Sequence, residues 1–198
     1  MRWLAVVCLG LALGAPAAAE ADAPAPKVCS QAEPGGRILC HTIVVAAPAA
    51  EVWPLIATAE GWQSWAAPVA ALDLRVGGLL ETSYDPSAHI GDAGNIRNRV
   101  LAFTPARLLV IEIADAPPGF PHANVARELR TALELEPIGA THTRVRVTMT
   151  GYRDGPEFDA LFAFFNRGNA FTLTKLAERI ERGPVDWGAQ HIPPAEPQ

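Results

Sequence analysis

The five histidines are the first candidates for acid–base or metal chemistry: His41, His89, His122, His142 and His191. No pair of them forms an HExxH pattern, and no two have the spacing of a paired metal site. The sequence also lacks zinc-type cysteine spacing, a nucleophile elbow, a P-loop and a dinucleotide-binding glycine pattern. It therefore predicts no catalytic set, no metal site and no cofactor.

Single histidines still deserve an interpretation. His41 falls opposite Cys40 in the alternation of an expected strand, so it points inward, where a packed, hydrogen-bonded role is favoured over catalysis. Asp85, His89 and Asp92 share one expected loop and could form an acid–base pair, but a solvated turn is the favoured reading.

The N-terminus has the order of a secretory signal peptide. Met1-Arg2 supplies a positive start, an apolar run follows over 3–13, and the small residues 17–19 complete an A-x-A site. The run is too short to span a bilayer as an anchor. We expect cleavage after Ala19, a mature chain that begins at Glu20, and a periplasmic or secreted protein.

Export changes the meaning of the cysteines. Cleavage would remove Cys8 and leave Cys29 and Cys40 in a compartment that permits disulfides. A turn at 34–36 (Pro-Gly-Gly) can fold one cysteine back beside the other, and we expect a structural disulfide between them.

Composition indicates one globular domain. The chain has 198 residues, a formal net charge of −5 and no basic run, which argues against a nucleic-acid partner. We expect a signal peptide over 1–19, a linker over 20–37 that contains the Cys29 turn, one domain over 38–182, and a flexible tail over 183–198. After cleavage no integral membrane segment is expected, and the protein should be a monomer or weak dimer.

Hydrophobic periodicity gives the order of the elements. A strand, two short helices, a run of antiparallel strands and one long helix follow each other over 38–46, 48–58, 61–65, 71–76, 79–84, 96–103, 108–113, 128–136, 143–151 and 156–182. The strands over 128–136 and 143–151 alternate most clearly. Pairing Glu134 with Arg146 and Glu136 with Arg144 places all four charges on the solvent face.

Four segments resemble one family. They are 49–53 (AAEVW), 60–65 (EGWQSW), 73–78 (DLRVGG) and 100–108 (VLAFTPARL). In this order they resemble the START-like superfamily, also called SRPBCC or Bet v 1-like. Within it, the similarity is greatest to the activator-of-Hsp90-ATPase-like and polyketide-cyclase-like group. Two departures are Asn98 in place of a glycine, and Gly168-Asn169 in place of Gly-Trp.

The resemblance implies an α+β helix-grip fold, in which a curved antiparallel sheet carries two short N-terminal helices and grips one long C-terminal helix. It also implies a cavity between sheet and helix that holds an apolar or aromatic ligand. The expected ligand-binding residues are Trp62, Trp65, Tyr84, Asn98, Phe103, Phe120, Phe162 and Phe165, with space left at Gly168.

Two functions remain open. One is an exported binding or carrier protein for a hydrophobic or aromatic small molecule; the other is a cyclase- or hydrolase-like enzyme that acts in the same cavity. An enzyme needs several inward polar groups, and the sequence offers only His41, Tyr84, Asn98, His122 and Thr131. This scarcity favours binding over catalysis. Hsp90 activation is not expected outside the cytoplasm.

Overall fold

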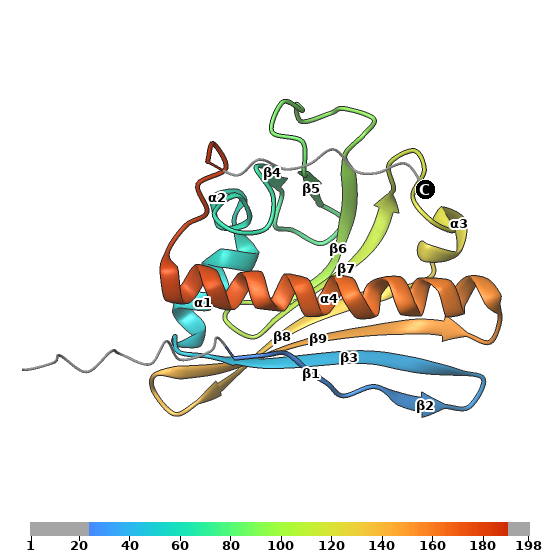
Figure 1. Cartoon of the computed structure of the whole chain (residues 1–198), viewed down its shortest axis with the longest axis horizontal. Helices are drawn as coiled ribbons and strands as arrows, with labels where there is room; N and C mark the ends of the chain where they lie inside the picture. The colour runs from blue at the N-terminus through green and yellow to red at the C-terminus, as the bar shows by residue number, and fades with distance from the viewer. Residues whose placement is uncertain (1–23, 190–198) are drawn as a thin grey trace, which may run out of the picture.

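A single curved sheet of nine antiparallel strands carries the long helix α4 (Pro156–Arg182) across one face (Figure 1). The architecture comes from a computed structural model that describes residues 24–189. The predicted signal peptide, including Cys8 and the cleavage site, lies outside these residues. The helix-grip α+β fold expected from the sequence is confirmed.

The elements follow the predicted order. The strands are β1 (Lys27–Val28), β2 (Gln31–Glu33), β3 (Gly36–Val45), β4 (Val69–Leu72), β5 (Leu79–Ser83), β6 (Ile96–Thr104), β7 (Leu108–Asp115), β8 (Arg130–Ile138) and β9 (His142–Arg153). The shorter helices are α1 (Ala49–Ala57), α2 (Ala59–Gln63) and α3 (Ala123–Ala126). The strand order in the sheet is β1-β3-β9-β8-β7-β6-β5-β4, and β2 also pairs with β3. No helix within residues 24–189 is long and apolar enough to cross a membrane.

The β8–β9 hairpin has the predicted register. Glu134 pairs with Arg146 and Glu136 with Arg144, and an ion pair joins Arg144 to Glu136 at 2.6 Å. Leucines and valines at the alternate positions are buried, because successive side chains of a strand point to opposite faces. A slip by one residue would exchange the two faces, so the burial of the apolar set fixes the register.

The sheet begins earlier in the chain than predicted. The segment assigned to a linker contains β1 and β2, which both pair with β3. Cys29 follows β1 and forms a disulfide with Cys40, with 4.8 Å between their Cα atoms. The backbone N–H of Cys29 also donates to the Cys40 carbonyl at 2.8 Å. The predicted cysteine pairing is therefore present, and it attaches this segment to β3.

The strand expected over 71–76 is displaced. Strand β4 ends at Leu72, and a tight turn follows, in which the N–H of Gly78 donates to the Arg75 carbonyl at 2.8 Å. A Cβ at Gly78 would lie 2.1 Å from the Asp73 carbonyl oxygen, and Gly77 has a φ of +83°. The turn between β4 and β5 therefore requires both glycines, and they do not mark the end of a strand that reaches residue 76.

Two groups of buried apolar side chains form the core. The larger one lies among α1, α2, the sheet and the C-terminal half of α4, where Leu173 and Leu176 are buried. The smaller one includes Leu39, Met149 and Tyr152 together with residues at the start of α4. The helix therefore covers two different sections of the core along its length.

Candidate functional site

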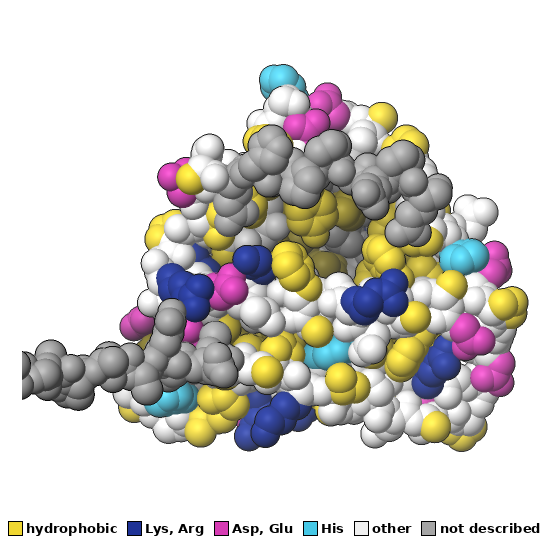
Figure 2. Space-filling view, viewed as in Figure 1, with side chains coloured by type: hydrophobic (Ala, Val, Ile, Leu, Met, Phe, Trp, Pro, Cys, Tyr) yellow, Lys and Arg dark blue, Asp and Glu magenta, His cyan; other side chains and the backbone are white. Residues whose placement is uncertain are grey.

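A cavity of about 350 Å³ lies among α2, strands β5 to β7, the C-terminal half of α4 and the segment that follows it. Figure 2 shows a hollow above α4 with hydrophobic side chains in its visible part. Four of the eight predicted ligand-binding residues line the cavity: Trp62, Trp65, Tyr84 and Asn98.

Two stacked indole rings form one wall. The rings of Trp62 and Trp65 lie 5.3 Å apart between centroids, with 24° between their planes. Both indole N–H groups are already bonded: Trp62 donates to the Ile56 carbonyl and Trp65 to the Leu55 carbonyl, each at 2.9 Å. Since indole nitrogen is only a donor, these rings have no unused hydrogen-bonding group to offer a ligand.

The position of this wall follows from close packing of α2 on α1. The N–H of Gly61 donates to the Thr58 hydroxyl at 2.9 Å, which caps α2. A Cβ at Gly61 would lie 2.0 Å from the Pro54 carbonyl oxygen, so no larger residue fits there. Glycine at this position allows α2 to approach α1 closely and places the two tryptophans beside the sheet.

Asn98 introduces a polar side chain on the opposite wall. Strand β6 pairs with β7 through Arg97–Asp115 and then Asn98–Ile113, which leaves one residue of β7 unpaired at that point. Such bulges bend a strand and change the direction of a side chain. The Asn98 side chain lines the cavity and makes no hydrogen bond to another group among residues 24–189, so its amide is available to a ligand.

Helix α4 and its C-terminal extension form a further wall, whose residues were not among the predicted ligand-binding residues. Phe171, Thr172 and Lys175 come from α4, and Val185 and Trp187 come from the segment after it. The predicted residues of α4 came from its aromatic first half. Phe171 was missed because it is a single phenylalanine in a polar stretch of the helix. For Trp187, the presence of a tryptophan in an otherwise proline-rich tail was the feature of the sequence that could have indicated packing against the domain.

The start of the predicted flexible tail is attached to α2. The indole N–H of Trp187 donates to the Gln63 carbonyl at 2.6 Å, and the N–H of Val185 donates to the Ser64 carbonyl at 2.9 Å. Arg179 reinforces this junction through a 2.9 Å hydrogen bond from its Nε to the Ser64 hydroxyl. Residues 183–189 therefore pack over one end of the cavity, and the tail after residue 189 lies outside the described residues.

The other four predicted ligand-binding residues do not line the cavity. Phe103 packs against the larger core group, and Phe120, Phe162 and Phe165 pack against the smaller one. Phe120 contacts Phe165 at 6.3 Å between ring centroids. Phe162 packs on Tyr152, so these rings contribute to the two core groups instead of lining this cavity.

Gly168 does not create the cavity either. A Cβ added there would meet nothing within 4 Å, and the residue is not among those lining the cavity. The cavity begins one turn later along α4, at Phe171. This cavity therefore lies nearer the C-terminal end of α4 than the space that we expected at Gly168.

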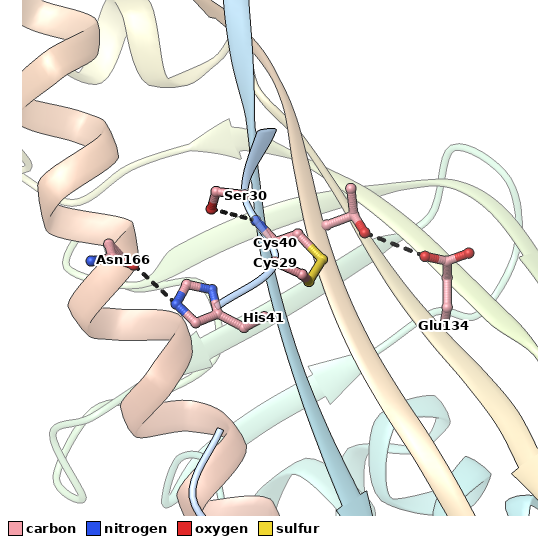
Figure 3. Close-up of a disulfide and its surroundings, with 7 residues drawn as sticks. Cys29, Ser30, Cys40, His41, Glu134 and Asn166 are labelled. Atoms are coloured by element: carbon pink, nitrogen blue, oxygen red, sulfur yellow. Dashed lines mark hydrogen bonds between the residues drawn. A yellow bond between two sulfur atoms is a disulfide. The ribbon is translucent and has the colours of Figure 1, made fainter. Parts of the chain in front are cut away.

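His41 is buried, but it lies outside the cavity. Figure 3 shows its ring pointing from β3 toward α4, where Nε2 lies 3.0 Å from the Asn166 side-chain oxygen. Burial lowers the pKa of His41, and the hydrogen bond to Asn166 opposes this effect. The neutral ring therefore has the packed, hydrogen-bonded role that its position in the strand predicts.

The remaining candidates for chemistry are dispersed. Asp85 accepts hydrogen bonds from Ser87, and Asp92 accepts one from the His89 backbone N–H at 2.7 Å, all in an exposed loop. His122 lies 3.5 Å from Glu157 near the start of α4. Neither these groups nor Thr131 line the cavity, and no group of three metal-ligating side chains occurs within residues 24–189.

Family comparison agrees with this architecture. Residues 39–181 match the family described as polyketide cyclase / dehydrase and lipid transport. The chain belongs to this family. No curated protein matches the chain.

Solved structures of proteins with low sequence identity to this chain share its fold. The Aha1 dimer of Colwellia psychrerythraea has 19% identity and a TM-score of 0.57, over 74% of this chain and 97% of that one. CalU16 of Micromonospora echinospora has 20% identity and a TM-score of 0.56, over 84% and 88%. EF2215 of Enterococcus faecalis has 12% identity and a TM-score of 0.58, over 81% and 80%.

The two departures from the family pattern have different consequences in this member. Asn98 lines the cavity and makes its wall more polar. Asn169 does not line it; its amide donates to the Met149 sulfur at 3.3 Å. The first departure changes what a ligand would meet, and the second changes the packing beneath α4.

Proposed function

We propose that the protein binds an apolar or aromatic small molecule in the cavity between the sheet and the C-terminal half of α4. The observation that carries the proposal is the pair of stacked indoles, Trp62 and Trp65, whose N–H groups are bonded to the backbone. A wall of this kind favours apolar contact and offers no hydrogen bonds. The amide of Asn98 adds a single orienting group, as small-ligand sites usually have.

The size of the cavity limits the ligand. At about 30 Å³ per water molecule in the liquid, a cavity of this volume holds about a dozen water-sized groups. Burial of apolar surface contributes about 25 cal/mol per Å², and binding must also offset the loss of ligand motion. We expect affinities of about micromolar for a compact aromatic molecule or a medium-length alkyl chain.

The proposal includes export and a carrier role. Support comes from the signal-peptide order of residues 1–19 and from the Cys29–Cys40 disulfide, since stable disulfides are typical of oxidising compartments. A carrier needs a cavity and a way for its ligand to leave. The segment 183–189 is attached to the end of α2 through hydrogen bonds of Trp187 and Val185, and we propose it as the part of the wall that opens.

A cyclase- or hydrolase-like enzyme is the second candidate. It is favoured by the family description and by the presence of Tyr84 and Lys175 on the same cavity. Acid–base catalysis needs two titratable groups within reach of one substrate. His41, the only buried histidine of the described residues, lies elsewhere, which favours binding.

The test uses a neutral fluorescent probe, N-phenyl-1-naphthylamine, with purified mature protein. We expect saturable binding in the wild type. A large side chain at Ala66, which lines the cavity, should abolish binding in Ala66→Phe, whereas Ala160→Phe on the exposed face of α4 should retain it. Unfolding of both variants is followed by circular dichroism to establish that they fold.

Native mass spectrometry of protein purified from its own host then identifies the ligand class. A co-purifying apolar compound released unchanged supports the carrier. Conversion of that compound by the protein would favour the enzyme. Failure of a folded wild type to bind any apolar probe would overturn the proposed function.

A further inference from the structure

In the part of the chain that the structure describes, one charged side chain lines the cavity, and it is a cation. The sequence contains only two lysines, Lys27 and Lys175. Lys27 is exposed on β1, whereas Lys175 lines the cavity from α4. No aspartate or glutamate among residues 24–189 lines it, although the chain as a whole is acidic. The charge of the cavity wall is therefore opposite in sign to the net charge of the protein.

The C-terminal end of α4 does not explain this lysine. The basic residues of the last turn are Arg179 and Arg182, which are the ones placed to offset the helix dipole. The dipole effect falls off within the last turn, and Lys175 lies before it.

The ion pair with Glu178 leaves Lys175 with unused donors. Nζ lies 2.8 Å from the Glu178 carboxylate and 5.6 Å from the centroid of the Phe171 ring. Both charged side chains are 30% exposed, and Glu178 does not line the cavity. An ammonium group has three N–H donors, so one acceptor on the solvent side leaves two for other partners.

We propose that the cavity binds an anionic amphiphile, with its carboxylate at Lys175 and its apolar body against Trp62 and Trp65. This inference rests on the proposed function and adds the charge of the ligand and its orientation. The ligand's carboxylate would accept hydrogen bonds from the Lys175 ammonium, which also donates to Glu178. The stacked indole rings have no free donor, so they contact the apolar part of the ligand. A cationic amphiphile of equal length would place its charge beside Lys175 and bind less tightly.

The experiment measures displacement of N-phenyl-1-naphthylamine by decanoate, 1-decanol and decylammonium at neutral pH and low salt. Lys175→Met retains the unbranched stem and removes the charge. Lys27→Met is the matched control, because it removes the other lysine from a surface far from the cavity. Glu178→Gln removes the competing carboxylate and keeps the shape of the side chain.

We expect Lys175→Met to weaken decanoate binding about tenfold more than it weakens the binding of the probe or of 1-decanol. Lys27→Met should change neither. Glu178→Gln should strengthen decanoate binding, and added salt should weaken it in the wild type.

Two results would separate the possible failures. If Lys175→Met binds the probe and retains wild-type affinity for decanoate, the orientation is wrong and the proposed function stands. If folded wild-type protein binds neither the probe nor any of the three amphiphiles, the proposed function itself fails.

Discussion

His41 on β3 and Asn166 on α4 join the sheet to the helix at the boundary between the two core groups. Along β3, His41 lies between Leu39 of the smaller group and Ile43 of the larger one. On α4, Asn166 lies between residues of the same two groups, and the ring and the amide meet at 3.0 Å. The Nδ1 atom of His41 is buried and has no partner in the described residues.

This contact predicts a pH-dependent stability. Because the pKa of His41 is lowered in the folded state, the unfolded chain binds a proton more readily. As the pH falls below about 6.5, the usual histidine value, the free energy of unfolding should decrease. His41→Gln should lose this slope in urea titrations at several pH values, and His142→Gln, an exposed control, should retain it. An unchanged slope in His41→Gln would contradict the assignment.

The Cys29–Cys40 disulfide should stabilise the fold by attaching β1 to β3. Closing a loop of this length contributes about 2–3 kcal/mol by restricting the unfolded chain. The double variant Cys29→Ser/Cys40→Ser should lower the free energy of unfolding by that amount while N-phenyl-1-naphthylamine still binds.

The wild-type protein, with both cysteines present, tests the export proposal. Intact mass of exported protein should correspond to a chain that begins at Glu20, and denatured protein should contain no free thiol. Two titratable thiols would show that the disulfide does not form in the exported chain.

Glu81 should hold the loop that follows Tyr84. Its Oε1 atom accepts hydrogen bonds from the Asn95 side chain at 2.6 Å and the Gly91 N–H at 2.7 Å, and Arg97 lies 3.2 Å away. Burial opposes ionisation of Glu81, but these donors outweigh it and lower its pKa. Glu81→Ala removes the acceptor of the Gly91 N–H, whereas Asn95 and Arg97 keep hydrogen bonds to His89, Asp92 and Asp115. The loss should cost about 1–3 kcal/mol at neutral pH.

The pH dependence has a definite sign. A carboxyl group whose pKa is lowered by folding contributes stability above its usual value near 4.5, and this stability is lost as the pH falls through the folded pKa. Acid should therefore destabilise the wild type more than Glu81→Ala. Glu33→Ala, an exposed carboxylate on β2, should behave as the wild type in the same titration.

Local pattern was enough to predict the order of the elements, because alternation and helical spacing depend on neighbours in the sequence, and the family resemblance then implied the helix-grip fold. The β8–β9 register followed from Glu134 and Arg146, and the long helix was predicted from Pro156 to Arg182, its observed bounds. The cavity depended on contacts between distant segments. Phe165 packs against Phe120, which comes from the loop before α3. The periodicity of α4 contains no information about this loop, so it could not show that Phe165 contacts Phe120 rather than a ligand.

The position of the cavity on α4 predicts opposite effects for two phenylalanines. Phe171 lines the cavity and is 63% exposed, so Phe171→Ala should weaken binding of N-phenyl-1-naphthylamine about threefold to tenfold with little change in stability. Phe165 packs with the smaller core group, so Phe165→Ala should lower the free energy of unfolding by about 2–4 kcal/mol and leave probe affinity unchanged. The reverse pattern would place the binding site in the first half of the helix, where the sequence analysis expected it.

Trp187 should control how quickly a ligand leaves. Its ring lines the cavity, and its indole N–H holds the segment 183–189 to α2 through the Gln63 carbonyl. Trp187→Phe retains an aromatic ring and removes the donor, while Trp187→Ala removes both. We expect the dissociation rate of N-phenyl-1-naphthylamine, measured by stopped-flow dilution, to rise about threefold to tenfold in Trp187→Phe and further in Trp187→Ala. Ser87→Ala, in an exposed loop outside the cavity, is the control. If both tryptophan variants release the probe at the wild-type rate, ligand exchange does not pass through this segment.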